Sequence, residues 1–127
     1  MIEYKELEVG YEFPAVSYEL TSAIITKYKD AVEDHSPVTD LVPPLAIAAY
    51  TLKAMSQFFQ LPPGSIHASQ ELEFFKEVTI GSYISCRAQV VQKISRGGLN
   101  MVVIKLDALD ENKERVLSGK ATLSLAN

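Results

Sequence analysis

The stretch LAIAAYTLKAMSQFFQ (45–60) decides the fold, because it is long enough for a helix and apolar on almost every side. At about 100° of rotation per residue, most of its polar side chains fall into one narrow sector; these are Lys53, Ser56, Gln57 and Gln60. A helix of this kind has to be enclosed over most of its circumference. We therefore predict a buried helix that begins after Pro44 and ends at LPPG (61–64). A carboxylate at Ala49, on the apolar arc, is expected to prevent folding.

The segments on either side of this stretch have different periods. Before it, TSAIITKYKDAVED (21–34) repeats apolar residues at helical spacing, with Thr21 or Ser22 as N-cap and Lys29 away from the apolar stripe. After it, apolar and polar residues alternate in the segments 65–75, 82–94, 99–109 and 115–125. Such alternation is typical of strands with one buried face. It places Cys86 on the buried face, and His67 and Lys93 on the polar face.

Turn residues join these strands into a sheet. Gly97-Gly98 and the polar run 110–113 separate the last segments, so 81–125 is predicted to be an antiparallel meander. A short strand around 11–18 contains Pro14, which confines it to a sheet edge. The order of strand, helix, buried helix and strands predicts a single α+β domain over 1–127, in which an antiparallel β-sheet wraps around one long central α-helix.

Composition limits the possible functions. The 127 residues carry 12 Lys and Arg against 16 Asp and Glu, without the clustered cations that nucleic-acid phosphates require. The longest apolar run, 45–50, is far too short to cross a bilayer. Cys86 is the only cysteine, which excludes an intramolecular disulfide and fits a reducing compartment. We expect a soluble cytoplasmic protein that binds neither nucleic acid nor membrane.

Several short motifs resemble those of the MaoC-like hydratase/dehydratase family, whose members have the hot-dog fold. In this chain an aromatic pair ending at Phe75 is followed by V-x-x-G (Val78, Gly81), with Glu77 where the family usually has Pro and Ser82 where it has Asp. The motifs G-x-x-F and A-V-x-D-x-x-P also match, at Gly10, Phe13, Ala31, Val32, Asp34 and Pro37. The resemblance implies a hot-dog domain that acts in fatty acid metabolism on acyl thioesters of CoA or acyl carrier protein.

The same resemblance implies where catalytic residues would lie. Active family members have a loop D-x-N-P-x-H, whose Asp and His activate water, and a later H-G, whose Gly N–H holds the thioester oxygen. In this chain Asp34 is present, but Thr39 stands at the position of the His and Pro43-Pro44 at that of His-Gly. Threonine by itself is no base near neutral pH, and proline has no N–H to donate. The resemblance therefore implies a lost catalytic site.

The candidate site residues each have a functional and a structural interpretation. Asp34 either takes part in catalysis or closes the turn before Pro37 by Asx-type bonding. His35 is either a relocated base or an exposed turn residue. The residues that would line an acyl tunnel are Pro44, Leu45, Met55, Phe59 and His67; the last also fits a surface or a dimer interface. Two histidines so placed form no metal-ligand cluster, so we expect no metal and no cofactor.

Three functions remain open at this point. The first is an acyl-thioester-binding subunit of an enoyl hydratase or 3-hydroxyacyl dehydratase system, without a complete site of its own. It would form a homodimer or a heteromer with a catalytic hot-dog subunit. The second is a self-sufficient hot-dog enzyme, either an (R)-specific enoyl-CoA hydratase/dehydratase or an acyl-CoA thioesterase, with rearranged residues such as Asp34 or Asp40. The third is a non-enzymatic acyl-binding or regulatory dimer.

Overall fold

The computed structural model describes residues 3–37 and 39–125, and it confirms the α+β class. After a 3₁₀ turn (Tyr4–Glu6), the elements are β1 (Val16–Glu19), α1 (Ser22–Ala31), α2 (Pro44–Ser56), β2 (Ile66–Phe74), β3 (Tyr83–Arg96), β4 (Leu99–Leu109) and β5 (Arg115–Leu125). The five strands form one antiparallel sheet in the order β1-β3-β4-β5-β2. The predicted meander is therefore present, and β1 lies at a sheet edge as predicted, although it begins at Val16, after Pro14.

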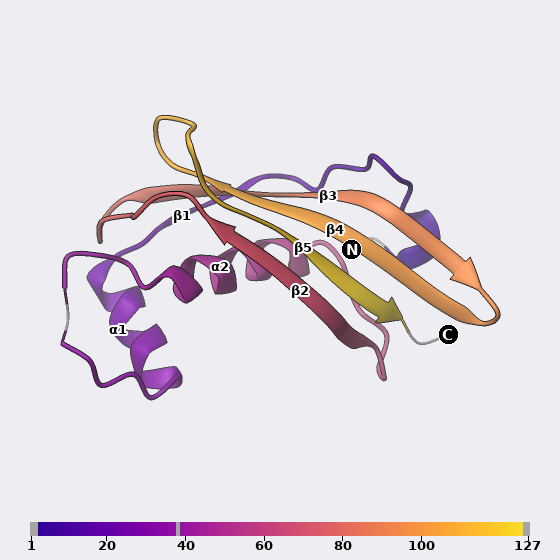
Figure 1. Cartoon of the computed structure of the whole chain (residues 1–127), viewed down its shortest axis with the longest axis horizontal. Helices are drawn as coiled ribbons and strands as arrows, with labels where there is room; N and C mark the ends of the chain where they lie inside the picture. The colour runs from indigo at the N-terminus through magenta and orange to yellow at the C-terminus, as the bar shows by residue number, and fades with distance from the viewer. Residues whose placement is uncertain (1–2, 38, 126–127) are drawn as a thin grey trace.

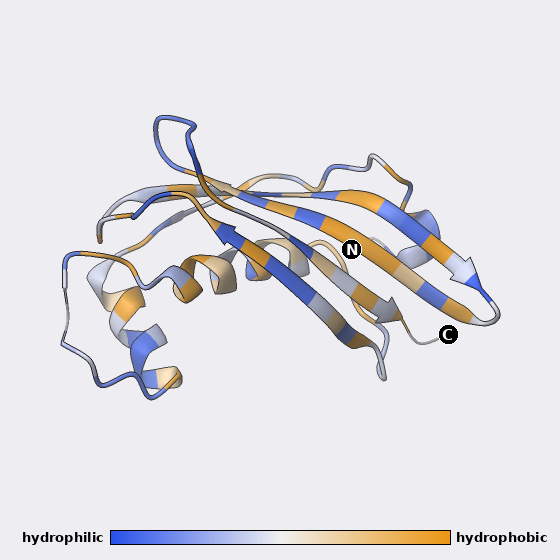
Figure 2. Cartoon of the chain, in the orientation of Figure 1, coloured by the Kyte–Doolittle hydropathy of each residue, from blue (hydrophilic) through white to orange (hydrophobic). Residues whose placement is uncertain are grey.

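The long helix α2 lies on one face of the sheet, where it packs against β3 and β4 (Figure 1). Hydrophobic and polar residues alternate along these strands, as Figure 2 shows, so each strand presents one apolar face to the helix. The buried residues of α2 are Ala46, Ile47, Ala48, Thr51, Ala54 and Met55. Across from them the sheet buries, among others, Ile84, Cys86, Val90, Ile104 and Leu106.

Two features of α2 differ from the prediction. The helix ends at Ser56, where the Phe58 N–H donates to the carbonyl of Met55 at 3.0 Å and a turn carries Phe59 into the core. The side of α2 away from the sheet is exposed; it carries Leu45, Ala49, Lys53 and Ser56. The expectation that Ala49→Asp prevents folding is therefore wrong for the single chain, because the new carboxylate would remain in water.

Two β-bulges change which side chains face the helix. On β2, His67 lies opposite Leu123 and Ser69 opposite Thr122, so one extra residue interrupts the alternation. Residues directly opposite in an antiparallel pair point to the same face, and Leu123 is buried. His67 is thus exposed on the same face of the sheet as the core, and its predicted place on the polar face is wrong.

A second bulge, between Val90 and Gln92 on β3, moves Lys93 to a position opposite the buried Val102. The Lys93 ammonium donates to the carbonyl of Leu7 at 2.9 Å and lies 4.4 Å from the centre of the Tyr4 ring. Its predicted place on the polar face is also wrong. No helix formed by the described residues is long and apolar enough to cross a membrane.

Candidate functional site

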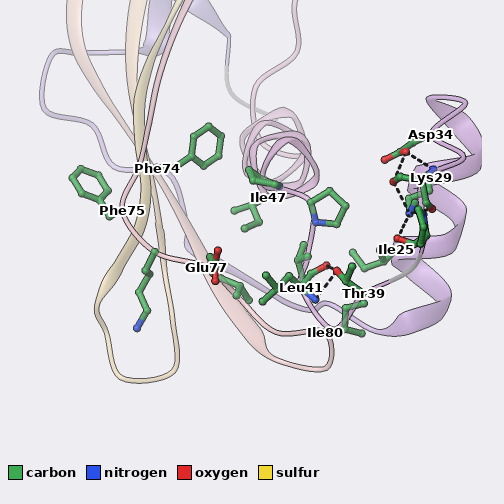
Figure 3. A pocket seen from close by; sticks show the side chains of 17 residues that line it. Ile25, Lys29, Asp34, Thr39, Leu41, Ile47, Phe74, Phe75, Glu77 and Ile80 are labelled. Carbon is green, nitrogen blue, oxygen red and sulfur yellow. Dashed lines mark hydrogen bonds between the residues drawn. The ribbon is translucent and has the colours of Figure 1, made fainter.

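A cavity of about 520 Å³ lies between α1, the loop that leads into α2, and the turn from β2 to β3 (Figure 3). Aliphatic side chains from all of these elements line it; they are Ile25, Leu41, Val42, Ile47, Val78 and Ile80. Phe74 and Phe75, each partly exposed, stand at one end of the cavity, and the polar group of Lys29, Asp34 and Ser36 stands at the other. This lining suits an apolar ligand that carries a polar end.

Backbone hydrogen bonds hold the two loops of the cavity together. The Val42 N–H donates to the carbonyl of Val78 at 2.8 Å, and the Ile80 N–H donates to the carbonyl of Asp40 at 2.7 Å. Gly81 follows with φ +96°, a left-handed conformation that other residues adopt only with strain, and its N–H donates to the carbonyl of Leu20. The loop before α2 and the β2–β3 turn therefore form one continuous wall.

The position of Asp34 is set by the way α1 ends. Thr21 caps the start of this helix, as predicted, by accepting a hydrogen bond from the Ile24 N–H at 3.2 Å. At the other end, Glu33 adopts a left-handed conformation with φ 56°, and the Asp34 N–H donates to the carbonyl of Lys29 at 2.8 Å. This is a Schellman motif, in which the chain reverses sharply after the last helical turn. Asp34 consequently turns back towards α1.

The Asp34 carboxylate is bound to its own loop. One of its oxygens accepts hydrogen bonds from the Ser36 N–H at 3.0 Å and from the Ser36 hydroxyl at 2.6 Å. The bond from the hydroxyl, followed by that from the N–H, lowers the pKa of Asp34, because both favour the ionised form. This geometry is that of an Asx turn. A carboxylate with a lowered pKa is a weaker base than a free one.

Lys29 is the polar residue of this cavity that the sequence did not indicate. Its side chain is only 8% exposed, so its predicted position away from the apolar stripe is wrong. The ammonium donates to the carbonyl of Ser36 at 2.7 Å and to the Ser36 hydroxyl at 3.2 Å, with the carbonyl of Pro37 at 3.5 Å. The signal available in the sequence was its spacing of four residues from the buried Ile25, which places both on one side of α1.

The positions at which the resemblance implies catalytic groups, Thr39 and Pro44, line this cavity. The Thr39 hydroxyl accepts a hydrogen bond from the Leu41 N–H at 3.2 Å, within its own loop. Pro44 is the first residue of α2 and Pro43 its N-cap, and neither has an N–H. The helix start therefore offers the cavity no backbone donor at these two positions.

Several predicted site residues lie elsewhere. His35 is exposed and does not line the cavity, and neither does Leu45, which is 60% exposed on α2. Met55 and Phe59 are buried in a separate core cluster, and His67 is at the opposite end of β2 from Phe74. Of the predicted tunnel residues, the cavity includes Pro44. Within 3–37 and 39–125, no three His, Cys, Asp or Glu side chains are grouped to hold a metal ion.

Solved structures of known proteins resemble the whole chain. A monoamine oxidase regulatory protein from Archaeoglobus fulgidus has a TM-score of 0.83 at 18% identity, over 98% of this chain and 94% of that one. The (R)-hydratase PhaJ1 from Pseudomonas aeruginosa has a TM-score of 0.82 at 18% identity, over 98% of this chain and 85% of that one. The HadBC complex, a 3R-hydroxyacyl-ACP dehydratase from Mycobacterium tuberculosis, has a TM-score of 0.71 at 17% identity, over 91% of this chain and 96% of that one.

No profile of a known protein family matches the chain, and no curated protein is similar to it at a significant level. At such low identities the structural likeness establishes the fold. The chain is a hot-dog domain, as the motifs around Phe75 and Gly81 implied.

Proposed function

We propose that this chain is a MaoC-like subunit that binds acyl thioesters of CoA or acyl carrier protein in the cytoplasm and lacks a complete hydratase site of its own. The observation that carries the proposal is the cavity at the start of α2, which is lined by aliphatic side chains and has Thr39, Pro43 and Pro44 in its wall. An apolar cavity of about 520 Å³ is large enough for an acyl chain. At the two positions where the resemblance implies the base and the N–H donor for hydration, this wall has Thr39 and Pro44, which cannot fill these roles.

The surface of the chain supports a partner subunit in this proposal. β2 is an edge strand whose side chains are mostly exposed, so its outer N–H and C=O groups are free to pair with another strand. A second such feature is the exposed side of α2, which presents Leu45 and Ala49. Two hot-dog subunits, identical or different, would cover both features at once. HadBC is a complex by its name, and a similar heteromer would provide the catalytic residues that this chain lacks.

Binding and turnover are tested separately. We expect isothermal titration to detect binding of butyryl-CoA or butyryl-pantetheine, whereas hydration of crotonyl-CoA, followed by loss of enoyl absorbance, should stay near background. Thr39→His alone should not restore turnover, because Pro44 still offers no donor to the enolate oxygen, and one such donor contributes about 2.7–4 kcal/mol. Thr39→His combined with Pro44→Gly is the smallest change expected to raise the rate. Ordinary hydratase rates in the wild type would contradict the proposal.

One observation favours the second candidate, a self-sufficient hot-dog enzyme. The Glu77 carboxylate lines the same cavity, and within the described chain it has no hydrogen-bond or ion-pair partner (Figure 3). A free carboxylate beside an apolar cavity is available to accept a proton from water. If the wild type hydrates crotonyl-CoA or hydrolyses butyryl-CoA, Glu77→Gln should abolish that activity. Glu73→Gln, a neighbouring exposed residue outside the cavity lining, is the matched control.

A further inference from the structure

The Lys29 ammonium is a buried charge without a contacting carboxylate. Its side chain is 8% exposed, and its hydrogen-bond acceptors are the neutral oxygens of Ser36 and Pro37. None of the four ion pairs between residues of 3–37 and 39–125 includes it. The Asp34 carboxylate does not contact it but is linked to it through the Ser36 hydroxyl, and, after the hydrogen bonds from Ser36, the charge of Lys29 contributes to the lowered pKa of Asp34. Buried charges are normally paired, because removing them from water is costly.

The same ammonium lines the apolar cavity, at the end opposite Phe74 and Phe75 (Figure 3). Its contact with the Pro37 carbonyl is 3.5 Å long, at the limit of a hydrogen bond, so the ammonium N–H that points there is only weakly bonded. An electronegative oxygen that enters the cavity would meet a cation in surroundings of low polarity, where the attraction is strong. The cavity therefore has an apolar body and a polar end, where the Lys29 ammonium can donate a hydrogen bond and the Asp34 carboxylate, held by Ser36, carries the opposite charge.

We propose that Lys29 is the polar anchor of this cavity, which binds the carboxyl-type oxygen of an acyl group while the acyl chain packs among the aliphatic side chains. That oxygen belongs either to the carbonyl of a thioester or to the carboxylate of a free acid. Lys29 thereby takes the place of the backbone donor that Pro43 and Pro44 cannot supply. The inference rests on the proposed function for its acyl ligand, and it adds the residue that recognises the ligand oxygen.

The test compares ligands that differ only in this oxygen. Butyryl-CoA carries the carbonyl, S-butyl-CoA is the thioether without it, and butyrate is the free acid. We expect wild-type protein to bind butyryl-CoA at least about tenfold more tightly than S-butyl-CoA, as a charge-assisted hydrogen bond predicts. Lys29→Met should remove most of this difference and leave S-butyl-CoA binding within about threefold, on the same scale. Lys27→Met, an exposed lysine on α1, is the matched control and should change neither affinity.

Each outcome decides the inference. If Lys29→Met weakens both CoA ligands equally, Lys29 only holds the loop in place, and the inference is overturned. Equal affinity of the wild type for the two ligands overturns it even if Lys29→Met does not fold. Butyrate binding that depends on Lys29 supports the anchor and identifies the free acid as the source of the oxygen. If the wild type binds none of the three, the proposed function fails, and the inference fails with it.

Discussion

The two sides of α2 both carry apolar residues in the first half of the helix, but their surroundings are opposite. The side towards the sheet is buried under β3 and β4, where Ala48 is 5% exposed. The other side is open to solvent, although Leu45 and Ala49 are as apolar as their buried neighbours. The exposed side, polar at Lys53 and Ser56, therefore keeps apolar surface at Leu45 and Ala49 that the sheet of the same chain does not bury. This difference, like the exposed edge of β2, supports the proposal that a partner subunit covers this surface.

The largest expected effect comes from placing the same charge on each side. Ala48→Asp puts an unpaired carboxylate against the sheet, which costs several kcal/mol, comparable with the whole stability of roughly 5–15 kcal/mol of a small domain. Ala49→Asp, one residue further, leaves the carboxylate in water. We expect Ala48→Asp to give insoluble or unfolded protein, and Ala49→Asp to give a folded domain by circular dichroism. Equal loss of folding in both variants would contradict the exposed position of Ala49.

Truncating one side chain on each side of α2 should give a smaller difference in the free energy of unfolding than the introduced charges do. Met55 is 6% exposed among aromatic and aliphatic residues of the core, so Met55→Ala should lower the free energy of unfolding by about 2–5 kcal/mol. Leu45→Ala should change the unfolding of the single domain by less than about 0.5 kcal/mol. Urea titrations measure both values.

Variants on the two sides of α2 also test the proposed partner interface. We expect light scattering at micromolar concentration to give at least a dimer mass for the wild type and for Met55→Ala where it is folded. Leu45→Ala, and more strongly Ala49→Asp, should shift the mass towards the monomer, because they remove apolar contact from the exposed side of α2. A monomer mass for the wild type would contradict the proposed interface.

Cys86 lies in the core between β3 and α2, and its thiol should make the free energy of unfolding depend on pH. Burial raises the pKa of its thiol from 9.0 to about 11, opposed only by a contact with the Thr51 hydroxyl at 3.7 Å. As the pH rises past 9, the unfolded chain loses this proton before the folded chain does, so stability falls until the folded thiol ionises too. The loss approaches about 2–3 kcal/mol. Cys86→Ala should remove this part of the pH dependence in urea titrations between pH 8 and 11, and a thiol reagent should react slowly with native protein at pH 8.

Much of the fold was predictable because period, turn residues and the apolar helix all indicate the same architecture. The alternation through Cys86 and the glycine turn at 97–98 define the meander, and β1 follows Pro14 at the sheet edge. The two errors in strand faces share one physical origin. A β-bulge adds one residue without a distinctive sequence, and each bulge reverses the faces of all residues beyond it, which is why His67 and Lys93 were misplaced.

The site was predictable in position but not in content. Asp34, Thr39 and Pro44, which the motifs single out, line one cavity, and the role of that cavity in binding stays a prediction. Lys29 could not be found in this way, since a lysine in an amphipathic helix is normally solvated and only the tertiary position of the loop buries it. The enclosure of α2 was overestimated for a related reason. Composition shows that a helix will be covered, but not whether its own chain or a partner covers it.

The smallest expected effect lies in the loop that leads from α1 to the exposed start of α2. Glu33 adopts a left-handed conformation with φ 56°, which costs a residue with a side chain about 1–2 kcal/mol. Glycine avoids that strain, but it also gives the unfolded chain more conformational freedom, which lowers the free energy of unfolding by about 0.5–1 kcal/mol. We therefore expect Glu33→Gly to raise the free energy of unfolding by a few tenths to about 1 kcal/mol. Lys113, with φ 62° in the β4–β5 turn, is the matched control, and Lys113→Gly should stabilise by a similar amount. Because the Schellman geometry suits glycine, butyryl-CoA affinity should stay unchanged in both variants. Destabilisation by Glu33→Gly alone would show that the Glu33 side chain, rather than the backbone turn, holds Asp34 and the cavity wall in place.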